Sequence, residues 1–285
     1  MDLPAVPPLA FGHPVPRLLA LGLAVLVAAV LAEALARRFV WRRATDLRAV
    51  AASLADALVR QGAGLAGLGL GAPLPAFAFV YAHRIGTIAL DSPARWLLLF
   101  LLVEFAYYLH HRAAHRVRWF WATHAVHHSS NEFLLAAAIR LGWTGRLGGA
   151  LLFYAPLVWL GYPPRAVFGL VAAGLFYQFW IHADWLPRLG PLEWVLNTPS
   201  HHRVHHASNP EYLDCNYGGT LIVFDRLFGS FVAERADTPP RYGLARPLRS
   251  HNPLRIALHE WIALGRALAA ARGLRARLGV LFGPP

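Results

Sequence analysis

The sequence predicts an all-α integral membrane protein of about four to five transmembrane helices, with interfacial helices and a cytoplasmic, histidine-rich site for two metals. Hydrophobic residues make up 56% of the 285 residues, and the mean hydropathy is +0.41. Only 15% of the residues are charged, against about a quarter in soluble proteins. The third observation is a series of apolar runs, the first of which is long enough to cross a bilayer, since a transmembrane helix needs ~20 residues.

The chain begins with a proline-rich stretch over residues 1–17, which we interpret as a leader. One membrane-embedded domain is expected over residues 18–285. Residues 18–36 are almost uncharged and predict the first span, and the pairs Arg37-Arg38 and Arg42-Arg43 follow directly. Because arginine is enriched in cytoplasmic loops, the first span is expected to run from the outside to the cytoplasm.

Further apolar segments predict the remaining spans. Residues 62–81 are apolar but rich in glycine and proline, and they predict a second span. Residues 93–109 predict a third, which returns to the cytoplasmic side. Residues 147–160 and 166–181 predict a helical hairpin, which starts and ends on one side of the membrane. This count places both histidine-rich windows of the chain at the cytoplasmic face.

Three segments are expected at the membrane surface rather than across it. Residues 44–60 and 259–281 are amphipathic, and residues 219–231 are apolar but too short to span. The 27 basic residues are all arginine and lie beside the apolar runs, which argues for a topological role and against nucleic-acid binding. The single cysteine, Cys215, excludes an intrachain disulfide and a cysteine-based zinc site.

Ten of the 15 histidines fall in two short windows, residues 110–128 and 201–206. Thr198-Pro199 supplies an N-cap and a first-turn proline for a helix over the second window. Within the windows, i, i+4 spacings place imidazoles on one face of a helix. The spaced pairs are His111 and His115, His124 and His128, and His202 and His206. His127 and His205 lie three residues after His124 and His202, on the same side of the helix.

This number of imidazoles favours two metal ions. One zinc ion usually takes four ligands, and imidazole binds iron, zinc, copper and nickel, so the ligand type does not choose the metal. His110 and His201 are each rotated by about 100° from a neighbour, and we interpret them as groups that orient a ligand, His201 being an additional ligand candidate. The isolated His13, His83, His251 and His259 are expected to have ordinary roles.

Carboxylates near these windows are candidates for supporting roles. Glu104 lies inside the third predicted span, two helical turns before His111, and ionisable groups in a membrane are costly and usually functional. We predict Glu104 and Asp225 as catalytic carboxylates, the alternative for Glu104 being a structural pair with an arginine. Asp184 and Asp214 are further candidates for orienting a ligand histidine.

The histidine windows resemble the boxes of the fatty acid hydroxylase/sterol desaturase superfamily. The segment EFAYYLHHRAAH, which starts at Glu104, resembles the first box; HAVHHSS from His124 resembles the second; and HHRVHH from His201 resembles the last. YQFWIH, which ends at His182, resembles an additional histidine segment of the alkylglycerol monooxygenase-like branch. The likeness covers roughly residues 75–262.

The resemblance implies a set of metal ligands and a chemistry. It implies two iron ions, O2, an apolar lipid substrate that enters from the membrane, and an external electron donor, either a protein or another reductant. The implied ligands are His111, His115, His124, His127, His128, His182, His202, His205 and His206.

The function expected on this basis is a membrane di-iron oxygenase that hydroxylates an alkyl or acyl chain or a sterol-like lipid, with ether lipids among the candidates. The bacterial inner membrane is the expected location. A desaturase with the same metal centre is the alternative. A histidine-rich metal transporter should line a path across the bilayer, and a zinc hydrolase typically carries His-Glu-x-x-His, which does not occur in this sequence.

Overall fold

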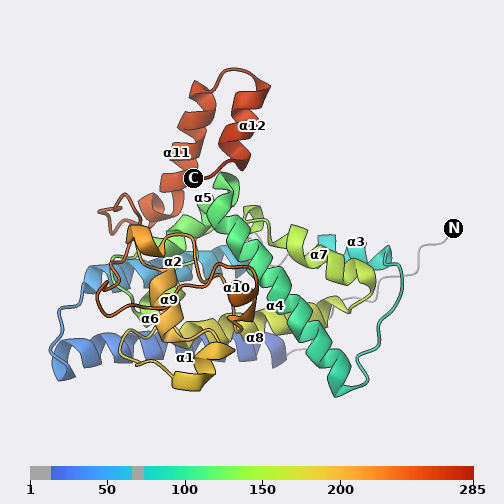
Figure 1. The fold of residues 1–285 in the computed structure, drawn as a ribbon, viewed down its shortest axis with the longest axis horizontal. Coiled ribbons are helices and arrows are strands. Elements are labelled where there is room, and N and C mark those ends of the chain that lie inside the picture. The colour runs from blue at the N-terminus through green and yellow to red at the C-terminus, as the bar shows by residue number, and fades with distance from the viewer. Residues whose placement is uncertain (1–13, 66–73) are drawn as a thin grey trace.

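The computed structural model describes residues 14–65 and 74–285, and Figure 1 shows their arrangement. The described residues form helices and connecting loops without a named strand, and their β-pairing is limited to isolated bridges. The predicted all-α class is therefore confirmed. Most of the expected leader, residues 1–17, lies outside the described part.

The N-terminal helices match the expected segments in part. α1 (Pro14–Leu35) covers the first predicted span and continues into a π-helical turn, η1 (Ala36–Val40). α2 (Leu47–Leu65) covers the predicted amphipathic segment. Of the predicted second span, only the end of α2 and α3 (Leu74–Ala82) are described, and the stretch between them lies outside the described residues.

α4 (Pro93–Arg116) begins at the predicted third span but extends seven residues beyond it, since the expectation ended at residue 109. The extension carries the histidines of the first box, so these histidines lie on the same helix as the apolar segment. A single extended residue, Val117, separates α4 from α5 (Arg118–His128), which carries the second box.

The predicted hairpin is present as α7 (Ala150–Leu160) and α8 (Pro164–Trp180). Its turn requires a glycine, because Gly161 has φ +116° and an added Cβ would lie 2.3 Å from the carbonyl oxygen of Gly86. The short α6 (Leu135–Ala138) and the 3₁₀ turn η2 (Gly145–Leu147) connect α5 to this hairpin.

The last histidine box forms α9 (Pro199–His205), so the predicted helix start is confirmed. Thr198 is the N-cap residue but makes no side-chain cap, because its hydroxyl donates instead to Glu193 Oε1 at 3.1 Å. The 3₁₀ turns η3 (Gly190–Trp194) and η4 (Pro210–Tyr212) flank this helix, and α10 (Val223–Leu227) follows them.

The prediction of one tail helix over residues 259–281 is wrong. Two helices, α11 (Pro253–Ala270) and α12 (Leu274–Phe282), project from the rest of the molecule as a hairpin (Figure 1). The helix breaks because Ala271 is extended and Gly273 has φ +84°, a conformation that glycine adopts without strain.

The core lies in separate clusters around the histidine boxes. One cluster packs α4 against α3, α7 and α8, with Leu99, Val103 and Val158 at most 2% exposed. A second packs α1 and α2 against α6. Within the described ranges, no helix reaches the combination of length and hydropathy that crossing a membrane needs, so the transmembrane spans stay a prediction.

Candidate metal centre

Nine histidines converge where α4, α5, α9 and the end of α8 meet, and they form two groups. In each group, one ring nitrogen of every histidine lies within 4.8 Å of the corresponding nitrogens of the others. These nine are the residues that the sequence singled out, and the structure brings all of them together. The five-histidine group consists of His111, His115, His124, His128 and His205, and the four-histidine group consists of His127, His182, His202 and His206.

In the five-histidine group, main-chain carbonyls fix the orientation of two rings. His111 Nδ1 donates to the carbonyl of Tyr217 at 2.8 Å, and His205 Nδ1 donates to that of Cys215 at 2.9 Å. A neutral imidazole that donates through Nδ1 carries its lone pair on Nε2. His111 Nε2 lies 3.0 Å from His124 Nε2, so the lone pair of His111 points toward a neighbouring imidazole of the group.

In the four-histidine group, main-chain carbonyls again fix the orientation of two rings. His127 Nδ1 donates to the carbonyl of Arg140 at 3.3 Å, and His182 Nδ1 donates to that of Gln178 at 2.7 Å. Both Nε2 atoms therefore carry lone pairs, yet they lie only 3.3 Å apart. Two lone pairs at this distance repel each other unless a cation lies between or beside them.

The donor set fits metal ions. Burial lowers the pKa of His127 and of His205 to about 4, so both imidazoles are neutral near pH 7 and can act as ligands. Among the described residues, Nε2 of His115 and of His205 are buried without any hydrogen-bond partner. Unpartnered buried nitrogens are costly, and coordination of a metal ion would satisfy them.

The predicted catalytic carboxylates, Glu104 and Asp225, both accept hydrogen bonds from main-chain groups. Glu104 Oε2 accepts hydrogen bonds from the backbone N–H groups of Thr220 and Leu221 at 2.7 and 2.8 Å. Asp225 accepts from the N–H groups of Tyr217 and Gly218, both at 2.7 Å, and from the hydroxyl of Ser230. Both carboxylates thus hold the segment over residues 217–221.

The two other candidate aspartates differ in their surroundings. Asp214 Oδ1 lies 3.8 Å from Nδ1 of the ligand candidate His115, and the carboxylate also pairs with Arg116 at 3.4 Å. Asp184 pairs with Arg37 at 2.7 Å and so ties η1 to the segment after α8. Of the four predicted carboxylates, Asp214 is the one that the described contacts place beside a grouped imidazole.

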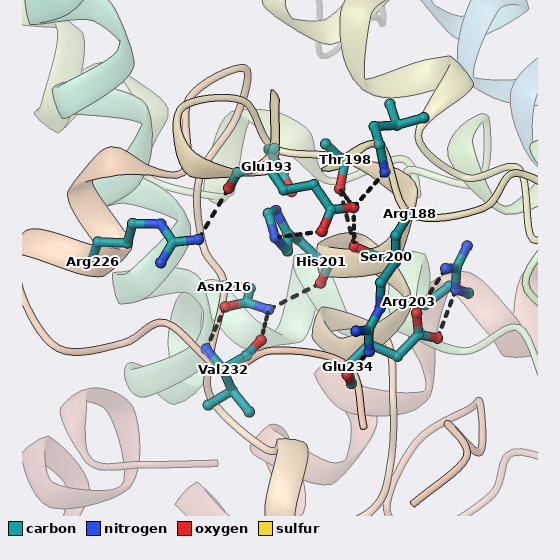
Figure 2. Close-up of polar contacts among 12 residues, drawn as sticks. Arg188, Glu193, Thr198, Ser200, His201, Arg203, Asn216, Arg226, Val232 and Glu234 are labelled. Carbon is teal, nitrogen blue, oxygen red and sulfur yellow. Dashed lines mark hydrogen bonds and ion pairs between the residues drawn. The ribbon is translucent and has the colours of Figure 1, made fainter. Parts of the chain in front are cut away.

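His110 and His201 lie outside both groups. His110 Nε2 donates to the carbonyl of Gly148 at 2.8 Å. His201 points toward Glu193, with its Nε2 3.8 Å from Glu193 Oε2 (Figure 2). It lines a pocket of about 280 Å³ together with Arg188 and Arg226.

The isolated histidines contact other parts of the chain. His83 donates to the carbonyl of Phe79, His251 pairs with Asp46 at 2.6 Å, and His259 donates to the carbonyl of Ile256. His13 lies outside the described residues. None of the three described histidines belongs to either group.

Asp56 is a residue that the sequence reasoning missed. It is fully buried on α2 and accepts hydrogen bonds from the backbone N–H groups of Leu141 and Gly142, both at 3.1 Å. These groups directly follow Arg140, whose carbonyl accepts from His127. The sequence signal that could have identified Asp56 is an acidic residue between Ala55 and Ala57, on the apolar side of an amphipathic helix.

A family model described as fatty acid hydroxylase matches residues 96–230, which include all nine grouped histidines. The alkylglycerol monooxygenase of Xenopus tropicalis is 41% identical over 203 residues, which are 71% of this chain and 45% of that protein. The alkylglycerol monooxygenase of Homo sapiens is 39% identical over a segment of the same length and coverage.

The ornithine lipid hydroxylase OlsE of Rhizobium tropici is 32% identical over 155 residues, 52% of this chain and 45% of that protein. The matched segment therefore spans less than half the length of these relatives. No solved structure matches the chain. The matches and the ordered histidine boxes agree that the chain belongs to the fatty acid hydroxylase/sterol desaturase superfamily, in its alkylglycerol monooxygenase-like branch.

Proposed function

We propose that this protein is a membrane-bound di-iron oxygenase that hydroxylates a lipid. The observation that carries the proposal is the pair His127 and His182, whose Nε2 lone pairs face each other at 3.3 Å in a buried site. A cation is the simplest partner for such a pair, and a second group of five imidazoles adjoins it. The relatives are named for lipid oxidation, as alkylglycerol monooxygenases and an ornithine lipid hydroxylase.

The proposed roles of the chain's own residues follow from their contacts. The nine grouped histidines hold two iron ions, which when bound supply the activation of O2 with electrons from an external donor. The carbonyls of Tyr217, Cys215, Arg140 and Gln178 keep four rings in the tautomer that presents Nε2. Burial of the imidazoles keeps water away from the centre.

Asp214 and Tyr107 have proposed supporting roles. The Asp214 carboxylate, 3.8 Å from His115 Nδ1, orients that ring. The ring of Tyr107 contacts that of His111 at a centroid distance of 5.3 Å, and its hydroxyl donates to Gln178 Oε1 at 2.6 Å. This contact links α4 to the helix that precedes His182, so it holds two ligand-bearing elements in register.

The proposal also includes embedding of the chain over residues 18–285 in a membrane as one domain. Large apolar side chains are exposed on α4, α7 and α8, among them Leu97, Leu98, Trp159 and Phe176. Exposed large apolar side chains on several helices favour contact with a membrane, because large exposed apolar patches on proteins usually mark interaction sites. We place the metal centre on the cytoplasmic face of a bacterial inner membrane, because the arginine pairs after α1 favour that orientation.

Metal content and turnover test the proposed centre. Alanine substitutions of His115, His128 and His205 are each expected to abolish O2-dependent lipid oxidation and to lower bound iron. His83→Ala and His259→Ala serve as controls, because both side chains lie outside the groups. Oxygen uptake and iron content are measured in detergent, with and without a chelator. Full activity with unchanged metal in all three alanine variants would contradict the proposal.

The membrane part has a separate test. After expression in bacteria, the protein should stay in the membrane pellet through an alkaline carbonate wash and leave it only with detergent. Recovery in the wash would contradict membrane embedding and would leave the metal centre untouched. Product analysis by mass spectrometry then separates hydroxylation, which adds an oxygen atom, from desaturation, which removes two hydrogen atoms.

A further inference from the structure

Each histidine group is supported by a buried aspartate. The aspartate does not touch a ligand ring itself but binds the main-chain segment whose carbonyl accepts a hydrogen bond from one. Asp225 and Asp56 are both fully buried, and each accepts hydrogen bonds from two consecutive backbone N–H groups. The two aspartates come from unrelated elements, α10 and α2. In both cases the anchored segment carries a carbonyl that accepts from a grouped histidine.

On the five-histidine side, Asp225 Oδ1 accepts from the N–H of Tyr217, and the carbonyl of the same residue accepts from His111 Nδ1 at 2.8 Å. Two residues earlier, the carbonyl of Cys215 accepts from His205 Nδ1. Between them, Asn216 bonds to the carbonyl of His201 and to Val232, which fastens the segment to α9 (Figure 2). One short segment therefore orients two rings of this group.

On the four-histidine side, Asp56 Oδ2 accepts from the N–H groups of Leu141 and Gly142, and the carbonyl of Arg140 accepts from His127 Nδ1. α2 fixes the same segment a second time, because Arg140 Nε donates to Ser53 Oγ at 3.0 Å. The other oriented ring of this group, His182, bonds to the carbonyl of Gln178 within its own helical turn.

We infer that Asp225 and Asp56 are positioning residues, each of which sets the metal affinity of one histidine group and leaves the other group unaffected. The inference rests on the proposed metal centre. Its physical basis is that a ring whose Nδ1–H loses its carbonyl partner can rotate or change tautomer, which withdraws the Nε2 lone pair. Loss of such a partner typically weakens metal binding by about 10–100-fold.

Asparagine is the suitable substitution at Asp225. It keeps the size of the side chain but turns one accepting oxygen into a donating amide. At Asp225 the amide then faces the N–H of Tyr217 or of Gly218, and the segment must move. At Asp56 both N–H groups donate to one oxygen, Oδ2, which asparagine would retain, so the substitution there is Asp56→Leu, which removes the acceptor at a similar size. The two variants are controls for each other.

The experiment measures ferrous-ion affinity and stoichiometry of the full-length chain in detergent, by chelator competition and elemental analysis. Asp225→Asn and Asp56→Leu are each expected to weaken the binding of one of the two ions by about 10–100-fold. Combination with ligand variants identifies the ion. His115→Ala should remove no further ion from Asp225→Asn, whereas His182→Ala should remove the remaining one. In Asp56→Leu the effects of His115→Ala and His182→Ala should be reversed.

The outcomes separate this inference from the proposed function. Wild-type affinity in both Asp225→Asn and Asp56→Leu would overturn the inference, while metal loss in His115→Ala and His182→Ala would still support the centre. Wild-type metal in those two alanine variants would overturn the centre itself. Loss of both ions from one of the aspartate variants with unchanged helical circular dichroism would also overturn the assignment of one aspartate to one group.

A milder substitution covers the case in which Asp225→Asn does not fold. Ser230→Ala removes only the hydroxyl that donates to Asp225 Oδ1 at 2.7 Å. It should weaken the ion of the five-histidine group by less than the asparagine variant does and leave the other ion unchanged. Unchanged affinity for both ions in a folded Ser230→Ala protein would count against the role of Asp225.

Discussion

The imidazole rings of His128 and His206 stack with centroids 4.3 Å apart and an angle of 19° between their planes, although they belong to different histidine groups. The first lies at the end of α5 and the second at the C-cap of α9. The two groups are therefore contiguous. A shift of the whole end of α5 or of α9 would displace histidines of both groups, whereas rotation of a single ring, the effect inferred for the aspartate variants, would not.

Removal of metal should therefore lower the thermal stability of the whole protein. Metal that binds the folded state alone stabilises it by about 4 kcal/mol when present at 1,000 times its Kd. We expect a chelator to lower the Tm of the detergent-solubilised protein and ferrous ion to restore it. Thermal unfolding followed by circular dichroism measures this. An equal Tm with and without metal would show that no bound ion stabilises the folded state.

Metal release on acidification should occur at an unusually low pH. Protons compete with metal for the Nε2 lone pairs. Burial lowers the pKa of His127 and His205 from the usual 6.5 to about 4, so the neutral, metal-binding form persists until the pH falls toward 4. We expect bound metal to survive dialysis at pH 5.5 and to be lost near pH 4. Release that follows a midpoint near 6.5 would indicate exposed, unshifted imidazoles.

Most of the grouped histidines could be picked out from the sequence because helical periodicity places them on one side of a helix. The i, i+4 spacing of His111 and His115 needs only a helix to place both rings on one side. His182 gave no such signal, and only the family resemblance pointed to it. Its place in the four-histidine group depends on how α8 packs against α5, which is a tertiary property.

The supporting contacts could not be predicted for the same reason. Asp56 and Leu141 are separated by 85 residues, and their hydrogen bond follows from how α2 meets the chain beyond α5. Glu104 was expected near His111 because both share a helical face. Its carboxylate instead accepts from backbone groups near Leu221, a partner that helical periodicity cannot reveal. The break in the tail helix likewise depends on the conformation of Gly273.

Gly218→Ala should disrupt the segment that orients the five-histidine group. An added Cβ would lie 2.1 Å from the carbonyl oxygen of Leu221 and 3.1 Å from Asp225 Oδ2, so the backbone must shift. We expect a loss of about 1–3 kcal/mol in stability together with weaker metal binding. Gly265→Ala is the control, since nothing lies within 4 Å of its added Cβ. In the interior of α11 it should stabilise by about 0.5–1 kcal/mol. Equal melting temperatures for the two variants would refute the close approach at Gly218.

Arg203 should hold α9 in the rotation that directs its histidines into the centre. Arg203 lies between His202 and His205 in sequence. Its side chain donates to both oxygens of Glu234 at 2.8 and 2.7 Å (Figure 2) and to the carbonyl of Leu186. Lysine cannot reproduce this paired geometry. Hydrogen bonds to charged groups are worth about 1.5–3 kcal/mol, so Arg203→Lys should lower the Tm and weaken metal retention.

Arg235→Lys is the matched control, because Arg235 makes the same two-point contact with Asp237 at the exposed surface. Solvent screens such a pair, so this variant should keep the Tm and the metal content of the wild type. The comparison of metal retention and Tm in the two lysine variants isolates the effect of anchoring α9. If Arg203→Lys retained metal as well as Arg235→Lys does, the rotation of α9 would have to be set by its apolar contacts, with Val204 packed against Tyr212 as the first candidate.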